Sequence, residues 1–240
     1  MLAMIRADIY RIIKGQQGVI SSIILLVLAV GLAWLGKDAG GEVASEQALV
    51  IGSLFIPIFL TVVLTVIWGQ EINNRTINNT LIAGASRLKF FISKWLLICI
   101  WTIVEIAIFV VGFNLASLIL GNGLLFNQLL PVIALQLPFY FAISALLLLL
   151  LNLFPTNTMA VLAFVTLLFM GDNLLQLLLQ VLAEPLSFIS EYFIFTNLNT
   201  MIHFAELTQA KIIAYITVAL LGGVVCLISS GLIFRKKALK

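Results

Sequence analysis

The sequence carries few charges. Asp, Glu, Lys and Arg make up only 10% of its 240 residues, whereas 62% are apolar and the mean hydropathy is +1.20. An ordinary soluble domain has about 25% charged residues. A water-soluble globule of this size could not cover its surface with so few charged side chains. The composition therefore excludes a soluble enzyme domain and predicts a chain dissolved mostly in lipid.

Residues that carry out chemistry are also scarce. Cys99 and Cys226 lie in long apolar runs and form no disulfide framework. Zinc sites need a cluster of His, Cys or carboxylate residues, and the one histidine, His203, is not part of such a cluster in the sequence. Ser86, in Gly84-Ala85-Ser86, resembles a serine nucleophile, but it is predicted on the other side of the membrane from His203, whereas a catalytic dyad needs about 3 Å. No phosphate-binding G-x-x-x-x-G-K-[ST] motif is present. We therefore expect no catalytic residue, metal or cofactor in this chain, and no nucleic-acid partner.

Six continuous apolar runs are each long enough to cross a bilayer, which takes about 20 helical residues. None shows the two-residue alternation of a barrel strand, so the sequence predicts an all-α integral membrane protein with six transmembrane helices. The predicted spans are Gly18–Gly36, Ala48–Gly69, Trp95–Leu120, Leu129–Leu153, Thr158–Leu182 and Ile212–Phe234. We interpret the first span as retained rather than cleaved, because no clean small-x-small site follows it.

Lys and Arg are distributed unevenly about these spans. With six spans, eleven of the thirteen lie on the side of the two termini, and only Lys37 and Lys211 lie on the other. Cytoplasmic loops carry the excess of Lys and Arg. Both termini are therefore predicted in the cytoplasm.

We expect a single domain, residues 1–240, with three parts that are not plain spans. Residues 1–14 place Leu2, Ile5, Ile9, Ile12 and Ile13 on one stripe, which predicts an amphipathic interfacial helix. Residues 70–94 form the longest cytoplasmic loop. Residues 183–211 have mixed polarity, which predicts a surface or re-entrant element outside span five rather than free coil.

The loop of residues 70–94 is highly patterned. Glu71 closes the second span, Thr76 follows five positions on, and Thr76 and Asn79 share a helical face. Ser86 is placed as the N-cap of the next helix, and Lys94 follows Arg87 by seven residues where the third span begins. Such a loop offers polar side chains to a soluble partner; the alternative is an ordinary solvated loop.

This pattern resembles the first cytoplasmic loop of ABC-2 type transporter permeases. The N-terminal helix, the six spans and the segment between spans five and six resemble the same family, whose exporters have a type V-like architecture. The Asn-rich Asn-Arg-Thr-Ile-Asn-Asn stretch resembles the lantibiotic and bacteriocin immunity branch. Glu71, Thr76, Asn79, Arg87 and Lys94 match the family pattern, whereas Arg75 stands where the family often has glycine.

The resemblance implies a permease of an ATP-driven exporter in a bacterial plasma membrane. Its loop would hold a coupling helix (Glu71, Arg75, Thr76, Asn79, Ser86, Arg87 and Lys94) that docks on a separate ABC ATPase, present in two copies, which binds ATP and Mg²⁺. A second permease, identical or homologous, would complete the pathway. The implied cargo is a hydrophobic or amphipathic peptide. Rival interpretations are an exporter of lipid, drug or polysaccharide, and a non-transporting scaffold or sensor.

Two carboxyl groups are predicted inside the membrane, Glu105 in span three and Asp172, followed by Asn173, in span five. A charge near the bilayer centre costs a few kcal/mol, so such residues usually face protein or water. Such residues either lie on the translocation path or are neutral carboxyl groups hydrogen-bonded to another helix. We favour the neutral, hydrogen-bonded interpretation for Glu105 and leave both open for Asp172. Gly171-Asp172-Asn173 also predicts a break in span five. Trp34, Trp68 and Trp95 are interpreted as anchors at the membrane interface.

Overall fold

The computed structural model describes residues 2–69, 86–182 and 189–236, and these ranges hold helices and no strand. The first range contains α1 (Leu2–Lys14), α2 (Gln17–Leu35), α3 (Gly41–Leu64) and a π-helical turn, η1 (Thr65–Gly69). The second contains α6 (Arg87–Ile119), α7 (Phe126–Leu153), α8 (Asn157–Thr166), a second π-helical turn, η2 (Leu167–Gly171), and α9 (Asp172–Leu182). The third contains α10 (Ile194–Thr200), the 3₁₀ helix η4 (Met201–Glu206) and α11 (Gln209–Lys236).

Six helical segments are long and apolar enough to cross a membrane, which confirms the predicted all-α, multi-span fold. All six begin before the predicted first residue, and two of them do so by seven residues or more. The second span starts at Gly41, seven residues before Ala48, and the third starts at Arg87, eight residues before Trp95. Hydrophobicity locates only the part of a helix that lies in hydrocarbon. A helix continues past that boundary, because its backbone hydrogen bonds are satisfied within the helix itself.

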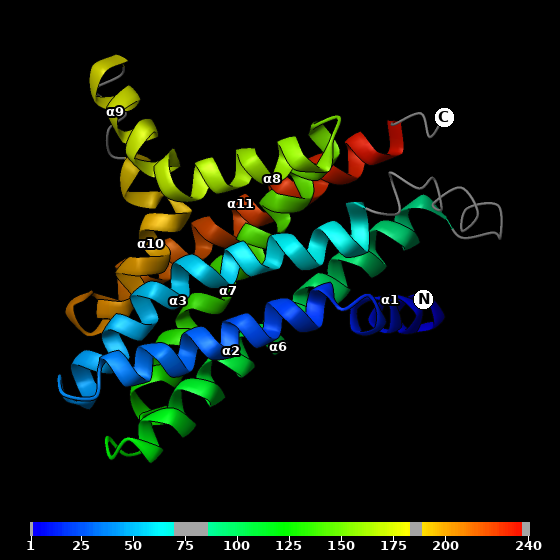
Figure 1. Ribbon diagram of the computed structural model, residues 1–240. Coiled ribbons are helices and arrows are strands. Elements are labelled where there is room, and N and C mark those ends of the chain that lie inside the picture. Colours follow the sequence, from blue (N-terminus) through cyan, green and yellow to red (C-terminus); the bar gives the residue numbers. More distant parts are fainter. Residues whose placement is uncertain (1, 70–85, 183–188, 237–240) are drawn as a thin grey trace.

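The interior of the bundle is built from α3, α6 and α7, in each of which about half of the residues are buried. Around them, α2 packs on α6 and α3, and α11 packs mainly on α7. The start of α1 and the end of α11 lie at the same end of the bundle (Figure 1). We call this end, with Lys14, Gly69 and Arg87, the terminal end; the end with Leu35 and Gly41 is the opposite end.

The N-terminal helix α1 lies against the bundle with part of its apolar stripe. Ile12 is fully buried, and Ile5 and Ile9 pack against the core. Ile13, which the sequence analysis placed on the same stripe, is 55% exposed. The apolar stripe is therefore narrower than predicted, and most of it is covered by protein rather than by lipid.

The fifth span is bent. Its helix α8 runs into the π-helical turn η2, which ends at Gly171, and Figure 1 shows α9 turning away from the direction of α8. The helix changes direction here but continues without interruption through Asp172 and Asn173, whereas the sequence predicts a break at Gly171-Asp172-Asn173. Because a π turn adds a residue to the helical repeat, it redirects the side chains that follow it, and such turns are frequent at functional sites.

The segment after α9 packs back into the bundle. Leu198 of α10 is buried, and its carbonyl accepts a hydrogen bond from Gln136 Nε2 at 2.8 Å. Gln136 lies ten residues into α7, so this contact is about 15 Å from the start of α7, which lies at the opposite end of the bundle. This part of the predicted outer segment, 183–211, is therefore inserted between spans rather than left as coil.

The fold predicts that the two ends of the bundle are exposed on different sides of the membrane. In a background with Cys99 and Cys226 replaced by serine, Asp38→Cys and Thr208→Cys should react with an impermeant maleimide on intact cells, because both positions are exposed at the opposite end. Lys14→Cys should react only after permeabilisation. Reaction of Lys14→Cys in intact cells at the rate of Asp38→Cys would contradict this topology.

Candidate functional site

Four aromatic rings join three helices at the terminal end. Trp68 of η1 is fully buried, and its ring centroid lies 5.7 Å from Phe90, 5.8 Å from Phe91 and 5.1 Å from Phe234. Phe90 and Phe91 belong to the start of α6, and Phe234 to the end of α11. We call these four residues the aromatic junction. The prediction that Trp68 is an interface anchor is wrong, because the ring is enclosed by protein; Trp34, at 57% exposure, is accessible as predicted.

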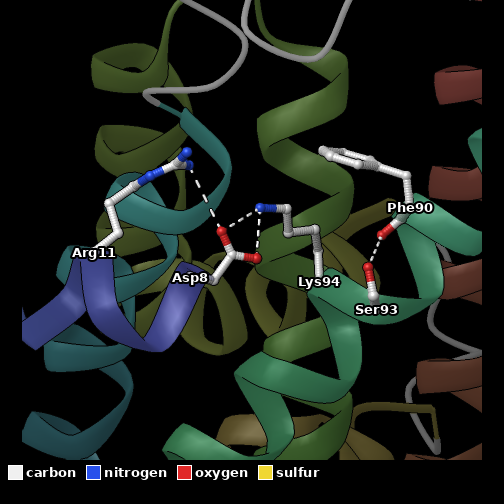
Figure 2. Close-up of polar contacts among 5 residues, drawn as sticks. All are labelled: Asp8, Arg11, Phe90, Ser93 and Lys94. Carbon is white, nitrogen blue, oxygen red and sulfur yellow. Dashed lines mark hydrogen bonds and ion pairs between the residues drawn. The ribbon is translucent and has the colours of Figure 1, made fainter. Parts of the chain in front are cut away.

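A buried ion pair fixes α1 beside this junction (Figure 2). Both carboxylate oxygens of Asp8 accept hydrogen bonds from Lys94 Nζ at 2.7 Å, and Arg11 Nη1 lies 3.6 Å from Asp8 Oδ1. Lys94 Nζ also lies 5.0 Å from the ring centroid of Phe90, close enough for a cation–π contact. Lys94 and Asp8 are 1% and 3% exposed. A buried charge is stable only when it is paired and hydrogen-bonded, so the pair requires α1 and α6 to stay together.

The local sequence explains why Asp8 is buried. It lies three residues after Ile5 and four before Ile12, so all three occupy one face of α1. That face packs against the bundle, and burial of the apolar residues carries the carboxylate inward. Lys94 extends from α6 to meet it. The sequence analysis missed Asp8; the signal was a lone acidic residue on the apolar stripe of an otherwise basic helix, which requires a buried cation elsewhere in the chain.

The predicted coupling residues are divided between two places. Glu71, Arg75, Thr76 and Asn79 lie outside the described residues. Ser86 is the N-cap of α6, as predicted, and its hydroxyl accepts a hydrogen bond from Lys89 N at 3.3 Å.

The remaining two predicted coupling residues bind within the chain. Arg87 Nη1 donates to the carbonyl of Arg235 at 2.8 Å and so ties the start of α6 to the end of α11. Lys94 is enclosed with Asp8, so its side chain does not lie on a surface that a soluble partner could reach.

A groove opens between three helices in the half of the bundle next to the terminal end. Its volume is about 580 Å³ and its lining is mainly apolar. The lining residues come from α2 (Gln17, Ile20, Ser21 and Ile24), from α3 and η1 (Phe59, Thr61, Val62 and Thr65) and from α8 (Asn157, Thr158, Val161 and Leu162).

The lining of this groove changes in polarity with depth. Gln17, Thr65 and Asn157 lie where their helices reach the terminal end, whereas Ile24, Phe59 and Leu162 lie deeper in the bundle. Hydroxyls along the walls bond to their own helix, as Thr61 Oγ1 does to the carbonyl of Ile58 at 2.7 Å. The groove therefore has the shape and polarity to hold an amphipathic chain whose polar group stays near the membrane surface.

A second cavity lies further along α3 and the fifth span. It has a volume of about 300 Å³ and is lined by Ser53 and Leu54 of α3, by Leu168, Phe169, Asp172 and Asn173 of η2 and α9, and by Phe195, Thr196, Leu198 and Asn199 of α10. Oδ2 of Asp172 accepts hydrogen bonds from the backbone N and the hydroxyl of Thr196, the latter at 2.8 Å. Ser53 Oγ is hydrogen-bonded to Asn199 Oδ1.

The groove and the cavity lie one after the other between α3 and span five. We call this line of openings, with α3 as one wall and span five as the other, the seam. A π-helical turn adjoins each of them, since Thr65 belongs to η1 and Leu168 to η2. At the terminal end the seam is closed by contact between Gly69 and Asn157: a Cβ atom on Gly69 would lie 2.3 Å from Asn157 Nδ2. Only glycine allows the two walls to approach so closely there.

The predicted intramembrane residues fall on different parts of this arrangement. Asp172 and Asn173 both line the second cavity. Glu105 lies on α6, is fully buried and lines neither the groove nor the cavity. Its carboxyl oxygens have no hydrogen-bond partner among the described residues. No group of three or more His, Cys, Asp or Glu that could hold a metal ion occurs in the described ranges.

Comparison with known proteins agrees with this architecture. A family model described as ABC-2 family transporter protein matches residues 13–171, which is more than half of the chain. The match runs from the end of α1 to the π-helical turn of span five and includes the aromatic junction except for Phe234. No curated protein matches the chain.

The buried ion pair predicts a specific pattern of stability. Lys94→Met should lower the free energy of unfolding by about 3–5 kcal/mol, because it leaves Asp8 buried without its principal cation. The double variant Asp8→Leu/Lys94→Met should recover most of that loss, since it removes both charges. Lys89→Met, at an exposed position of the same helix, should change the free energy by no more than about 0.5 kcal/mol.

Thermal and denaturant unfolding of the purified protein in detergent measures these differences. If the double variant is as unstable as Lys94→Met alone, the coupling between the two charges is contradicted.

Proposed function

The chain belongs to the ABC-2 family of transporter proteins, and we propose that it is the membrane subunit of an exporter that moves a hydrophobic or amphipathic peptide out of the membrane. Family membership implies a transporter component that works with an ABC ATPase and is not itself catalytic. The observation that carries the proposal is the groove between α2, α3 and α8, because it is open and largely apolar, and its amide side chains lie toward the terminal end. The proposal that the cargo is a peptide is based on the resemblance of the Asn-rich loop to the immunity branch.

The structure around residues 70–85 supports a role for this loop in coupling. Gly69 and Ser86, the residues that flank it, both adjoin the aromatic junction. In the proposal the ATPase presses on the loop, and the junction passes that displacement to η1, α6 and α11 together. Through Lys94 and Asp8 the same displacement reaches α1. Several helices then move as one body, because their contacts are buried and closely packed.

Movement at the junction would act directly on the groove. Thr65 lines the groove and belongs to the same π-helical turn as Trp68 and Gly69. Gly69 in turn contacts Asn157, the first residue of the opposing wall. A displacement of η1 therefore changes the separation of α3 and α8 at the terminal end. In the proposal this opens the groove toward cargo in one state and closes it in the other.

The proposed working unit contains two ATPases, which bind ATP and Mg²⁺, and two permeases, identical or homologous. One bundle supplies only part of a pathway, because its groove is open rather than enclosed. The eleven-to-two distribution of Lys and Arg supports a cytoplasmic terminal end in a bacterial plasma membrane. ATP would then be hydrolysed on the side from which cargo enters the groove.

The coupling role predicts that the loop holds the ATPase. Replacing both Thr76 and Asn79 by Trp should reduce co-purification of the ATPase with the permease at least about tenfold, because bulky side chains on the docking face exclude the partner. Glu71→Gln should weaken the complex to a smaller extent. The matched control is Asp38→Asn/Lys37→Gln, which changes charge at the opposite end. Wild-type association and wild-type transport in the Trp variant would rule out this loop as the coupling element.

The groove predicts a position where added bulk blocks transport. Leu162→Trp should lower ATP-driven export and cargo-stimulated ATP hydrolysis about tenfold or more, because residue 162 lines the groove and is 62% exposed. Leu221→Trp is the control: Leu221 is 61% exposed on α11 and lines neither the groove nor the cavity. Transport into inverted vesicles measures both. Equal effects of the two substitutions would contradict a cargo path along the groove.

A further inference from the structure

We propose that the cavity beside Asp172 binds a primary ammonium group, supplied either by an amphipathic cargo or by the headgroup of phosphatidylethanolamine. The inference rests on the proposed function only in its cargo arm, because a lipid headgroup needs no transport. The site that we assign consists of Asp172 with the oxygen-bearing side chains around it, Ser53, Asn173 and Asn199.

The cavity lies deep in the membrane-spanning part of the bundle. Ser53 is twelve residues from the start of α3 at Gly41 and sixteen from the end of η1 at Gly69. On the opposing wall, Asp172 is fifteen residues from the start of α8 at Asn157. At about 1.5 Å for each helical residue, Ser53 lies roughly 18 and 24 Å from the two ends of its span. Asp172 lies about 22 Å from the start of α8 and about 15 Å from the end of α9 at Leu182. A carboxylate at this depth usually faces a partner group or a water-filled cavity rather than lipid.

Its charge favours a cation. Asp172 is the only ionisable residue among the described residues that line the cavity, and no Lys, Arg or His is present there to neutralise it. Both hydrogen bonds that Asp172 accepts go to Oδ2, from the backbone and the hydroxyl of Thr196. The second carboxylate oxygen, Oδ1, accepts no hydrogen bond from the described residues. This oxygen is therefore available to a donor that enters the cavity.

The geometry selects among cations. A guanidinium group binds best through two parallel hydrogen bonds to both oxygens of a carboxylate, but Thr196 already occupies Oδ2. A divalent metal ion would need several acidic or imidazole ligands, and no such group of three occurs in the described ranges. An ammonium group has three N–H donors, and each can bond to a separate oxygen atom, so no bidentate carboxylate is needed. Oδ1 of Asp172 supplies a charged acceptor, and the amide oxygens of Asn173 and Asn199 are neutral ones that line the same space.

The cavity lies close enough to the apolar groove for one amphipathic molecule to occupy both. Along α3, Thr61 of the groove and Ser53 of the cavity are eight residues apart, which corresponds to about 12 Å. An apolar body in the groove and an ammonium group beside Asp172 can thus belong to one molecule of modest length. The apolar groove supplies affinity for the body, and the carboxylate supplies selectivity for the charge.

The experiment measures binding to the full-length permease in phosphatidylcholine nanodiscs, without ATPase or ATP. The probes are dansylcadaverine, which carries a primary ammonium group, and its N-acetyl derivative, which is neutral. Fluorescence anisotropy should show about tenfold or greater preference for the amine, since a hydrogen bond to a charged partner accounts for a difference of this size. Asp172→Asn should remove the preference while leaving binding of the acetylated probe unchanged.

Asp172→Asn is suited to this test because an asparagine oxygen can still accept both hydrogen bonds from Thr196, so only the charge is removed. Its melting temperature should match that of the wild type. Glu42→Gln, which removes an exposed acid at the opposite end outside the cavity, is the control and should retain the preference. Equal binding of the two probes by the wild type, a preference that survives Asp172→Asn, or no binding of either probe would overturn the proposal.

A lipid arm distinguishes the two sources of the ammonium group. If the headgroup of phosphatidylethanolamine occupies the cavity, nanodiscs that contain this lipid should weaken binding of dansylcadaverine to the wild type but not to Asp172→Asn. Unchanged affinity assigns the site to cargo. The result is independent of the exporter proposal: loss of ATPase association would leave this binding intact, and failure of both probes to bind would leave ATP-driven export untouched.

Discussion

Hydrocarbon offers no hydrogen-bond partner to a polar group, and several polar side chains inside the bundle are held by hydrogen bonds to other segments of the chain. Asn114 bonds to the carbonyl of Val110 and accepts from the backbone N of Leu125, which fixes the turn between α6 and α7. Asn152 donates to Ser230 at 2.9 Å and joins α7 to α11. The same requirement pairs Asp8 with Lys94 and brings the carbonyl of Leu198 to Gln136. Close packing fills the rest of the bundle, but these bonds set which helices stay together.

The terminal end and the seam differ in how completely their side chains are packed and hydrogen-bonded. At the terminal end, the aromatic junction, the Arg87–Arg235 hydrogen bond and the buried Asp8–Lys94 ion pair join η1, α6, α11 and α1. Along the seam, by contrast, a groove and a polar cavity separate α3 from span five, and each adjoins a π-helical turn. Motion is expected where packing is incomplete, and transmission where it is complete. In the proposed mechanism, the terminal end would transmit motion and the walls along the seam would move apart or together.

Much of this arrangement could be predicted from the sequence. The spans follow from hydrophobicity and the N-cap at Ser86 from its residue type. Two polar residues after a glycine mark where span five changes direction, but the helix bends at a π-helical turn there and does not break. Partners distant in sequence could not be predicted. Asp8 and Lys94 are 86 residues apart, and only the packing of α1 on α6 brings them together. Trp68 carries the same local signal as an interfacial tryptophan, and its burial depends on Phe234 at the far end of the chain. The π-helical turns depend on tertiary contacts and have no sequence signature that we could use.

The central claim is that ATP binding at the terminal end changes the width of the groove, and distance measurement across the groove tests it most directly. Spin labels at Val19 of α2 and Met159 of α8 would stand at exposed positions on the two walls without lining the groove itself. Double electron–electron resonance on the permease–ATPase complex should show one distance distribution without nucleotide and a second, displaced by several ångströms, with ADP and vanadate. A distribution that stays the same while the complex hydrolyses ATP would contradict the account.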